Sequence, residues 1–385
     1  MKIVKSFFLI FIAGLSCVIN ENCAMAQAKS NFYWFYVGTY TGAKSKGIYY
    51  GKYEPVSGKI ELKGLGAQTI SPSFLAVHPD NKYLYAVNES NLRGKQEGGV
   101  SAFQINQSTG ELTEINQTLS GGNSPCHLTT DRTGKYLLVA NYGSGTVACF
   151  KLNKTGGIGE KTAQIQHAGS GTNPSRQKGP HAHWVGLSAD NKYAFVCDLG
   201  LDKILIYKFD ENSGDLKPND PSFVKLNDGA GPRHLTFHPN EKFAFVINEL
   251  DSTITALEYN NGSFKTFNTV KTFPTDYNGQ NSGAEIEVHP NGKFVYGSNR
   301  GHDSIVCFEF IPEKKDLQLI QTISSGGKMP RHFAITPDGN YLLAANQSTD
   351  NLVLFKLNSN TGKLTAVEEK VEVGSPVCII FIKPE

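Results

Sequence analysis

The stretch GPRHLTFHPNEKFAFVINEL, residues 231–250, decides the fold of this chain. Two apolar segments rich in β-forming residues flank a tight His-Pro-Asn turn at residues 238–240, which is the pattern of a β-hairpin. In a hairpin, the start of the first strand lies beside the end of the second strand. We therefore expect the Arg233 guanidinium and the Glu249 carboxylate to meet at one edge of the sheet.

Copies of this hairpin recur along the chain at a period of about 50 residues. The six copies begin at Pro72, Pro125, Ala182, Pro232, Gly283 and Pro330. Each copy is followed by a third and a fourth strand pattern. Four strands in a repeat of this length are typical of a propeller blade rather than of a solenoid coil.

The two ends of the chain complete a seventh repeat. Residues 376–382 supply its first strand, and residues 32–39, 47–53 and 60–67 supply the other three. Joining the termini in one blade closes the ring and hides its sheet edges. The sequence thus predicts an all-β, seven-bladed β-propeller with four antiparallel strands per blade, a single domain over residues 27–385.

The first part of the chain, residues 1–26, has the pattern of a secretory signal peptide. Two lysines precede a short apolar run, and small residues before Gln27 provide a cleavage site. The run is too short to span a bilayer, and we expect no membrane span in the mature chain. We expect cleavage after Ala26 and an exported protein, periplasmic or secreted; a lipoprotein signal ending at Cys17 is the alternative.

Composition narrows the classes of partner. The formal net charge of +2 argues against a nucleic-acid partner, because phosphate binding needs concentrated basic surface. The cysteines after the signal peptide lie mostly in apolar strand patterns without a CxxC motif, so we expect buried thiols rather than disulfides. We expect no cofactor, no metal, and a monomer or weak dimer.

The two faces of the ring are expected to differ in loop length and charge. Long polar loops at residues 90–98, 166–180 and 273–283 fall on the face where first strands begin, and tight turns fill the other face. Of the arginines, only Arg132 belongs to the turn face. Arginine binds carboxylates and phosphates through a bidentate fork, and binding loops usually sit on rigid scaffolds. We therefore expect a small anionic ligand on the loop face.

The histidines divide between the faces in the same way. His78, His238 and His289 belong to His-Pro turns, where we expect structural roles. The candidate substrate-binding residues on the loop face are His127, His181, His234, His302, Arg331 and Glu285. A structural role is the alternative for each of them. The imidazoles come from separate blades, which does not favour a metal centre.

Three consecutive blades direct the main candidate catalytic groups to one sector of the loop face. These groups are His183, Arg233 with Glu249, and Arg300. A structural ion pair is the alternative for Arg233 and Glu249. The convergence of Arg300 on the same edge favours a site.

At these residues the chain resembles the bacterial 6-phosphogluconolactonases of the seven-bladed propeller type, a family that also contains fungal carboxy-muconate cyclases. The segments that carry the resemblance are GPRH at 231–234, NEL at 248–250, SNRGHDSI at 298–305, GPHAH at 179–183 and VANYGSG at 139–145. The resemblance extends from residue 37 to the last strand. It implies a site of one histidine, two arginines and one glutamate, which falls here on His183, Arg233, Arg300 and Glu249.

The resemblance also implies hydrolysis of a small anionic sugar lactone, 6-phosphoglucono-lactone or a related aldonolactone, to the open acid. Arg233 and Arg300 would supply charge, because arginine stays protonated, and His183 or Glu249 would activate water. A neighbouring arginine lowers the pKa of a carboxylate, which favours His183 as the base. The alternatives are a muconate-type lactone-forming cyclase and a secreted, non-enzymatic propeller that binds a sugar or a protein.

Overall fold

The computed structural model describes residues 32–92 and 97–384. These residues lie almost entirely in strands and tight turns, and the helix among them is a single 3-10 turn, Pro312–Lys314. Within the described ranges, no helix has the length and apolar character needed to cross a membrane. The expected signal peptide and the alternative processing site at Cys17 lie outside the described residues.

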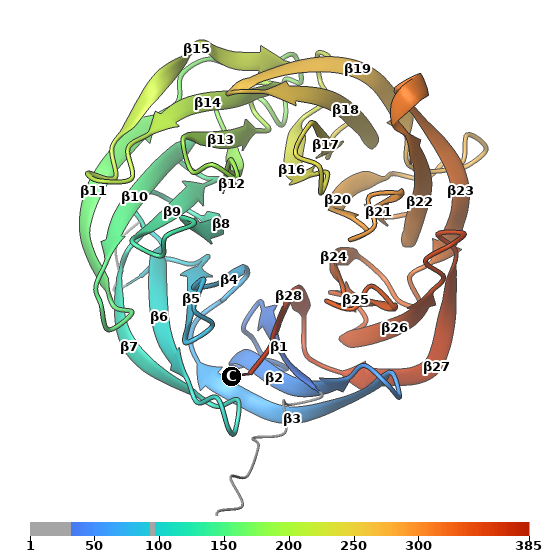
Figure 1. Ribbon diagram of the computed structural model, residues 1–385, viewed down its shortest axis with the longest axis horizontal. Helices are drawn as coiled ribbons and strands as arrows, with labels where there is room; N and C mark the ends of the chain where they lie inside the picture. The colour runs from blue at the N-terminus through green and yellow to red at the C-terminus, as the bar shows by residue number, and fades with distance from the viewer. Residues whose placement is uncertain (1–31, 93–96, 385) are drawn as a thin grey trace, which may run out of the picture.

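The strands form seven four-stranded antiparallel sheets arranged as blades around a central axis (Figure 1). The blade that closes the ring contains β28 (Pro376–Ile382), β1 (Tyr33–Thr39), β2 (Gly47–Glu54) and β3 (Lys59–Gln68). The next blades contain β4 (Leu75–Val77), β5 (Tyr83–Asn88), β6 (Gly99–Ile105) and β7 (Leu112–Leu119), then β8 (Pro125–Thr130), β9 (Tyr136–Asn141), β10 (Thr146–Leu152) and β11 (Ile158–Gln166). They are followed by β12 (Ala182–Leu187), β13 (Tyr193–Asp198), β14 (Lys203–Phe209) and β15 (Leu216–Lys225), then β16 (Pro232–Phe237), β17 (Phe243–Asn248), β18 (Thr253–Asn260) and β19 (Ser263–Lys271). The last two blades contain β20 (Ser282–Val288), β21 (Phe294–Arg300), β22 (Ser304–Ile311) and β23 (Asp316–Ser324), then β24 (Pro330–Ile335), β25 (Tyr341–Asn346), β26 (Asn351–Leu357) and β27 (Leu364–Glu372).

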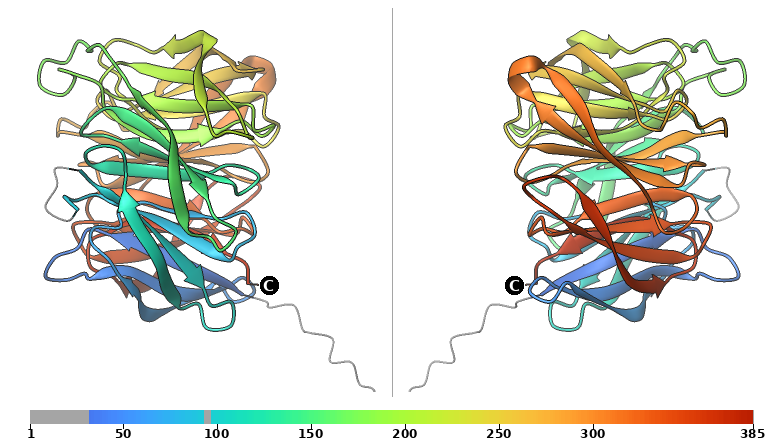
Figure 2. Two further views of the ribbon diagram at one scale, coloured as in Figure 1. Left: turned by 90° about the vertical axis from the view of Figure 1, so that its left-hand side faces the viewer. Right: turned by 90° about the vertical axis from the view of Figure 1, so that its right-hand side faces the viewer.

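The closure of the ring through both ends of the chain is confirmed. The last strand, β28, pairs antiparallel with β1, with Val37 opposite Ile379. Figure 2 shows the result from the side: the blades stack into a short cylinder with connections at its two ends. The first strand of each blade lies nearest the central axis, so residues at the ends of these strands meet around this axis.

Apolar side chains from facing blades form the core between the blades. In one such cluster, Phe195 and Ile206 of one blade pack with Leu235 and Val246 of the next. Middle strands such as β9 and β21 are buried along their whole length, whereas an outer strand such as β15 is largely exposed. Burial of these apolar side chains provides the main stabilisation of the ring. The five cysteines of the described chain are buried and free, as expected from their apolar surroundings.

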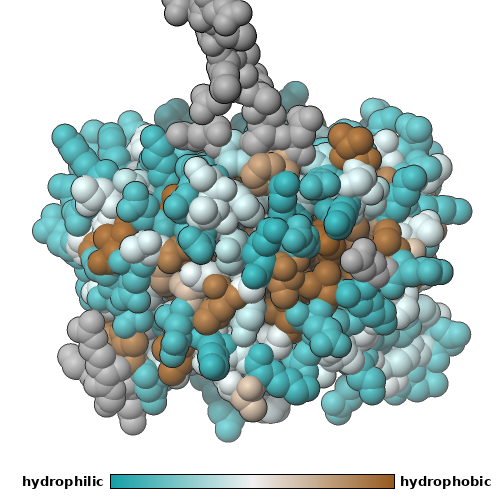
Figure 3. Space-filling view, turned by 90° about the horizontal axis from the view of Figure 1, so that it is seen from below, coloured by the Kyte–Doolittle hydropathy of each residue, from teal (hydrophilic) through white to brown (hydrophobic). Residues whose placement is uncertain are grey.

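The outer wall of the closing blade is mainly hydrophilic, with apolar side chains in smaller areas between the polar ones (Figure 3). Val56 and Leu65 are among the exposed apolar residues. Scattered apolar side chains of this kind are normal for a protein surface.

The His-Pro turns hold neighbouring blades together, which confirms their structural role. In His78, His238 and His289, Nε2 lies 2.9 Å from the carbonyl oxygen of a glycine in the next turn. In His238 and His289, Nδ1 accepts a hydrogen bond of 3.1 Å from the backbone N–H two residues on. With Nδ1 as acceptor, Nε2 carries the proton and donates to the carbonyl, so both ring nitrogens are satisfied.

Candidate active site

The inner strands of four blades carry a β-bulge at their second residue. The register of the ladder shifts between Pro125 and His127, Ala182 and Trp184, Pro232 and His234, and Pro330 and His332. The bulged residues are therefore Cys126, His183, Arg233 and Arg331. A bulge re-aims a side chain and is frequent next to functional sites, and here it occurs at the loop-face end of each of these inner strands.

Three of these four side chains line one pocket of about 320 Å³, which we call the loop-face pocket. Its lining residues are Glu89, Cys126, Tyr142, Arg176, His183, Glu249, Ser282, Arg300 and Arg331. The fourth bulged residue, Arg233, is buried and contacts the pocket through Glu249. The structure thus brings together the four residues that the sequence analysis treats as the main candidates.

Glu249 is the centre of the charge network. Arg300 Nη2 donates to its Oε2 at 2.8 Å, and Arg233 Nε lies 3.4 Å from the same oxygen, as the hairpin geometry predicts. Arg176 Nη2 donates to Oε1 at 2.6 Å. Burial alone would raise the pKa of Glu249, but the charges of Arg300 and Arg233 and the hydrogen bond from Arg176 together hold it well below its ordinary value. Glu249 is therefore an ionised, fully engaged carboxylate.

Positive charge exceeds negative charge around this pocket. Four guanidinium groups, those of Arg176, Arg233, Arg300 and Arg331, surround two carboxylates. Burial, with the nearby Arg331 and Arg300 charges, lowers the pKa of Arg233 to about 9. An anion entering the pocket would relieve this repulsion.

Arg331 is the guanidinium best placed to receive such an anion. It is half-buried and lies over the Tyr40 ring, 5.5 Å from its centroid. Within the described part of the chain, its guanidinium has neither a side-chain hydrogen bond nor an ion pair, in contrast to Arg176 and Arg300.

His183 supplies a neutral imidazole to the same pocket. Its side chain is buried, and Nδ1 has no hydrogen-bond partner among the described residues. Burial and the charges of Arg233 and Arg331 outweigh the influence of Glu249 and hold the pKa of His183 well below its ordinary value. An imidazole that is neutral at neutral pH can accept a proton, which an ion-paired carboxylate such as Glu249 does poorly.

Three of the candidate substrate-binding residues lie beneath the pocket, in what we call the inner layer, formed by His127, His234, His332, Glu285 and Phe74. His234 Nδ1 and His332 Nε2 lie 3.0 Å and 3.2 Å from Glu285 Oε2. Phe74 packs against His127 with ring centroids 4.0 Å apart. Arg233 Nη1 lies 3.2 Å from His234 Nε2, so the inner layer supports Arg233 from below.

The other candidates occupy different positions. Arg331 lines the pocket directly. His181 stacks on Tyr142 at 4.4 Å and lies behind this wall of the pocket. His302 contacts Ser304 Oγ through Nδ1 at 2.7 Å and packs on Tyr277, and it is not among the residues that line the pocket.

Arg176 is a pocket residue that the sequence analysis did not select. It lies on the long loop between β11 and β12, and its position depends on the neighbouring Gln177. Gln177 is buried, and its Nε2 donates to Asp202 Oδ1 at 2.7 Å and to the Leu199 carbonyl at 2.8 Å. The sequence signal for Arg176 was present, because this loop is long and belongs to the loop face.

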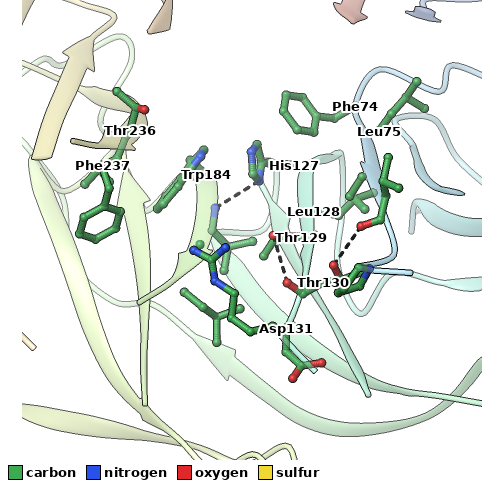
Figure 4. A pocket seen from close by; sticks show the side chains of 18 residues that line it. Phe74, Leu75, His127, Leu128, Thr129, Thr130, Asp131, Trp184, Thr236 and Phe237 are labelled. Carbon is green, nitrogen blue, oxygen red and sulfur yellow. Dashed lines mark hydrogen bonds between the residues drawn. The ribbon is translucent and has the colours of Figure 1, made fainter. Parts of the chain in front are cut away.

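A second and larger cavity, of about 670 Å³, opens toward the turns, and we call it the turn-face cavity (Figure 4). Its walls include the aromatic side chains of Phe74, Trp184 and Phe237, with hydroxyl groups from Thr129 and Thr130. The only charged groups among its lining residues are Arg132, Asp131 and His127 if protonated. The Asp131 carboxylate accepts hydrogen bonds from the backbone N–H groups of residues 133, 135 and 136 in its own turn. This cavity therefore lacks the cation excess of the loop-face pocket.

Among the described residues, no group of three or more His, Cys, Asp or Glu side chains is arranged to hold a metal ion. Burial raises the pKa of the Cys126 thiol, so this pocket residue is a poor nucleophile. The groups available for chemistry in the loop-face pocket are thus guanidinium, carboxylate, imidazole and hydroxyl.

Fold and site together define the class: a seven-bladed propeller with an arginine-rich pocket that contains two glutamates and one histidine. The family model described as "Lactonase, 7-bladed beta-propeller" matches residues 34–381. The chain therefore belongs to the seven-bladed β-propeller lactonase family.

Individual relatives agree with this assignment. The chain is 38% identical over 350 residues to the 6-phosphogluconolactonase of Bacillus subtilis strain 168, covering 90% of this chain and 97% of that protein. It is 36% identical over 350 residues to a 6-phosphogluconolactonase of Formosa agariphila, covering 88% and 96%. The solved structure of a Pseudomonas aeruginosa periplasmic gluconolactonase is similar with a TM-score of 0.86 at 31% identity, covering 92% of this chain and all of that one, 100%.

Proposed function

We propose that this lactonase hydrolyses a sugar lactone to the open hydroxy acid in the loop-face pocket. The observation that carries the proposal is the excess of guanidinium groups around a neutral His183, with Arg331 in no hydrogen bond or ion pair among the described residues. Water attack on a lactone carbonyl creates an oxyanion, and preorganised positive charge stabilises such a transition state. The names of the relatives support 6-phosphoglucono-lactone or a related aldonolactone as the substrate.

The steps follow from the chemistry of these groups. His183 accepts a proton from water as its oxygen attacks the carbonyl carbon, and the carbonyl oxygen becomes an oxyanion near Arg300. When the tetrahedral intermediate collapses, the bond between the carbonyl carbon and the ring oxygen breaks. The departing alkoxide takes the proton back from the His183 imidazolium, which leaves a hydroxy acid.

The remaining charged groups hold this geometry. Glu249 fixes Arg300 and Arg233 in place through ion pairs. Arg176, on the loop between β11 and β12, forms a further ion pair with the same carboxylate. Arg331 receives a phosphate or carboxylate group of the substrate or product through charge-assisted hydrogen bonds. A depressed pKa makes His183 a weak base, but a lactone is an activated ester and needs only modest base strength.

Hydrolysis of 6-phosphoglucono-δ-lactone and glucono-δ-lactone tests the proposal, with acid release followed above the spontaneous rate. We expect the wild-type protein to accelerate at least one of them. His183→Ala should lower kcat by about 10²- to 10⁴-fold, the range for losing a general base. Wild-type-like turnover in His183→Ala, or no acceleration by the wild type, contradicts the proposal.

Export of the chain is a further part of the proposed function. It rests on the signal-peptide pattern of residues 1–26 and on the similarity to a periplasmic gluconolactonase. Fractionation of cells that express the full chain should place the protein outside the cytoplasm with Gln27 at its N-terminus. A protein retained in the cytoplasm with residues 1–26 intact contradicts export.

A further inference from the structure

Glu89 differs from Glu249, although both carboxylates line the loop-face pocket. Glu89 follows β5 directly, and its Oε2 accepts hydrogen bonds from the Tyr40 hydroxyl at 2.8 Å and from Ser73 Oγ at 2.6 Å. No described residue forms a hydrogen bond with Oε1 or an ion pair with Glu89. Among the described residues, one oxygen of this carboxylate is therefore held by two donors, and the other has no donor.

The two donors fix the orientation of Glu89. Ser73 is buried, and burial raises the pKa of Tyr40, so the phenol stays protonated and donates. The same Tyr40 ring lies under Arg331. Tyr40 thus sets the position of both a free hydrogen-bond acceptor and a free cation at one side of the pocket.

A free carboxylate oxygen selects for hydrogen-bond donors. The ring oxygen and carbonyl oxygen of a lactone only accept hydrogen bonds, and a phosphate or carboxylate is repelled by a second anion. The groups on a sugar lactone that can donate are its hydroxyls. Charge-assisted bonds from hydroxyl groups to a carboxylate are short and strong, and a site built for a hydroxyl discriminates strongly against an analogue that lacks it.

We propose that Glu89, positioned by Tyr40 and Ser73, forms a hydroxyl-recognition subsite that selects polyhydroxylated lactones over unsubstituted lactones of the same ring size. This inference rests on the proposed hydrolysis in the loop-face pocket. It adds a specificity residue that is separate from the groups that activate water and stabilise the oxyanion.

The test compares two six-membered lactones, glucono-δ-lactone, which carries hydroxyls, and δ-valerolactone, which carries none. Glu89→Ala and the isosteric Glu89→Gln should lower kcat/KM for glucono-δ-lactone by about 10- to 100-fold, the range for a hydrogen bond to a charged group. Both variants should keep kcat/KM for δ-valerolactone within about twofold. Tyr40→Phe and Ser73→Ala should lower the ratio of kcat/KM for glucono-δ-lactone to kcat/KM for δ-valerolactone by about 3- to 10-fold.

Asp228→Asn is the matched control, because Asp228 is an exposed loop carboxylate that pairs with Lys225 away from the pocket lining. It should leave both rates unchanged. Equal losses on the two lactones in Glu89→Ala, or no loss on either, overturn the subsite.

A binding measurement separates this inference from the proposed hydrolysis. The probe 1,5-anhydroglucitol has ring hydroxyls but no lactone bond, so its binding is independent of turnover. Calorimetric titration should show wild-type binding that weakens at least about tenfold in Glu89→Ala. Equal affinity of the two proteins for this probe overturns the subsite, whereas failed lactone hydrolysis with unequal affinity overturns only the proposed reaction.

Discussion

The loop-face pocket and the turn-face cavity lie on opposite faces of the ring, and their difference in chemistry does not follow from their volumes. The turn-face cavity is the larger, about 670 Å³ against about 320 Å³. At the turn end, however, the histidines of the His-Pro turns are satisfied: His289 uses both ring nitrogens in hydrogen bonds. At the loop end, His183 Nδ1 and the Arg331 guanidinium have no such partners among the described residues. Unsatisfied groups and excess charge, rather than size, mark the site.

The inner strand β16 shows the same contrast within six residues. Toward the turn, the ladder is regular, with Leu235 opposite Val246 and Phe237 opposite Ala244. At the loop end, the register shifts between Pro232 and His234, and Arg233 is the bulged residue. Regular pairing serves stability at one end, and an irregularity aims a side chain at the other.

The largest expected effect comes from exchanging one histidine at each end. His183→Ala should lower kcat by about 10²- to 10⁴-fold through loss of the proton acceptor. His289→Ala should leave kcat unchanged and lower the free energy of unfolding by about 1–3 kcal/mol through lost hydrogen bonds. Steady-state kinetics and urea unfolding of both variants check the pair. A folded His289→Ala protein with a lowered kcat, or a His183→Ala protein with the kcat of the wild type, would contradict this contrast between the two ends.

The arginines provide a second pair. Arg300→Met should lower kcat/KM by about 10²- to 10³-fold, because it removes a charge next to the developing oxyanion. Arg132→Met, which changes the arginine of the turn-face cavity, should keep kcat/KM within about twofold. A loss in Arg132→Met equal to that in Arg300→Met would contradict the assignment of the reaction to the loop-face pocket.

Arg176 should show a smaller effect, because its side chain is 42% exposed and solvent weakens its ion pair with Glu249. Arg176→Ala should raise KM by about 3- to 10-fold and change kcat little. Gln177→Ala should act in the same direction, since Gln177 holds the loop that carries Arg176. Initial rates over a range of substrate concentration separate KM from kcat, and an unchanged KM in both variants contradicts a binding role for this loop.

The smallest effect is a shift in pH dependence. The pKa of His183 is lowered, so its neutral, proton-accepting form persists below pH 6.5 and is lost only as the pH falls through the lowered value. The acid limb of kcat/KM should therefore lie well below pH 6.5. Arg331→Gln removes a positive charge that lowers this pKa, so the limb should move upward in pH. A limb at 6.5 in the wild type, or a downward shift in the variant, contradicts this electrostatic environment.

The repeat was sufficient to predict the architecture, because each hairpin carries its own turn and strand signals. The expected strands at both termini correspond to β28, β1, β2 and β3. The meeting of Arg233, Glu249 and Arg300 also followed from hairpin geometry, since strand ends on one face must converge. Regular, local patterns of this kind are readable in sequence.

Other parts of the site depend on contacts that a repeat does not encode. Arg176 reaches Glu249 because Gln177 anchors the loop between β11 and β12 to Asp202, which lies between β13 and β14. His302 belongs to the same loop face, but its ring turns to Ser304 instead of the pocket. The sequence analysis did not predict the bulges, because each lies at the second residue of its strand and too few strand residues precede it to show a break in the apolar alternation.

The most direct test of the contrast between the two ends is a crystal structure of the protein with 6-phosphogluconate, the open acid that the proposed reaction would form. We expect the anion in the loop-face pocket, with carboxylate or phosphate oxygens in contact with Arg300 or Arg331. An anion bound only in the turn-face cavity, with the loop-face pocket unoccupied at saturating concentration, would contradict our assignment of the site.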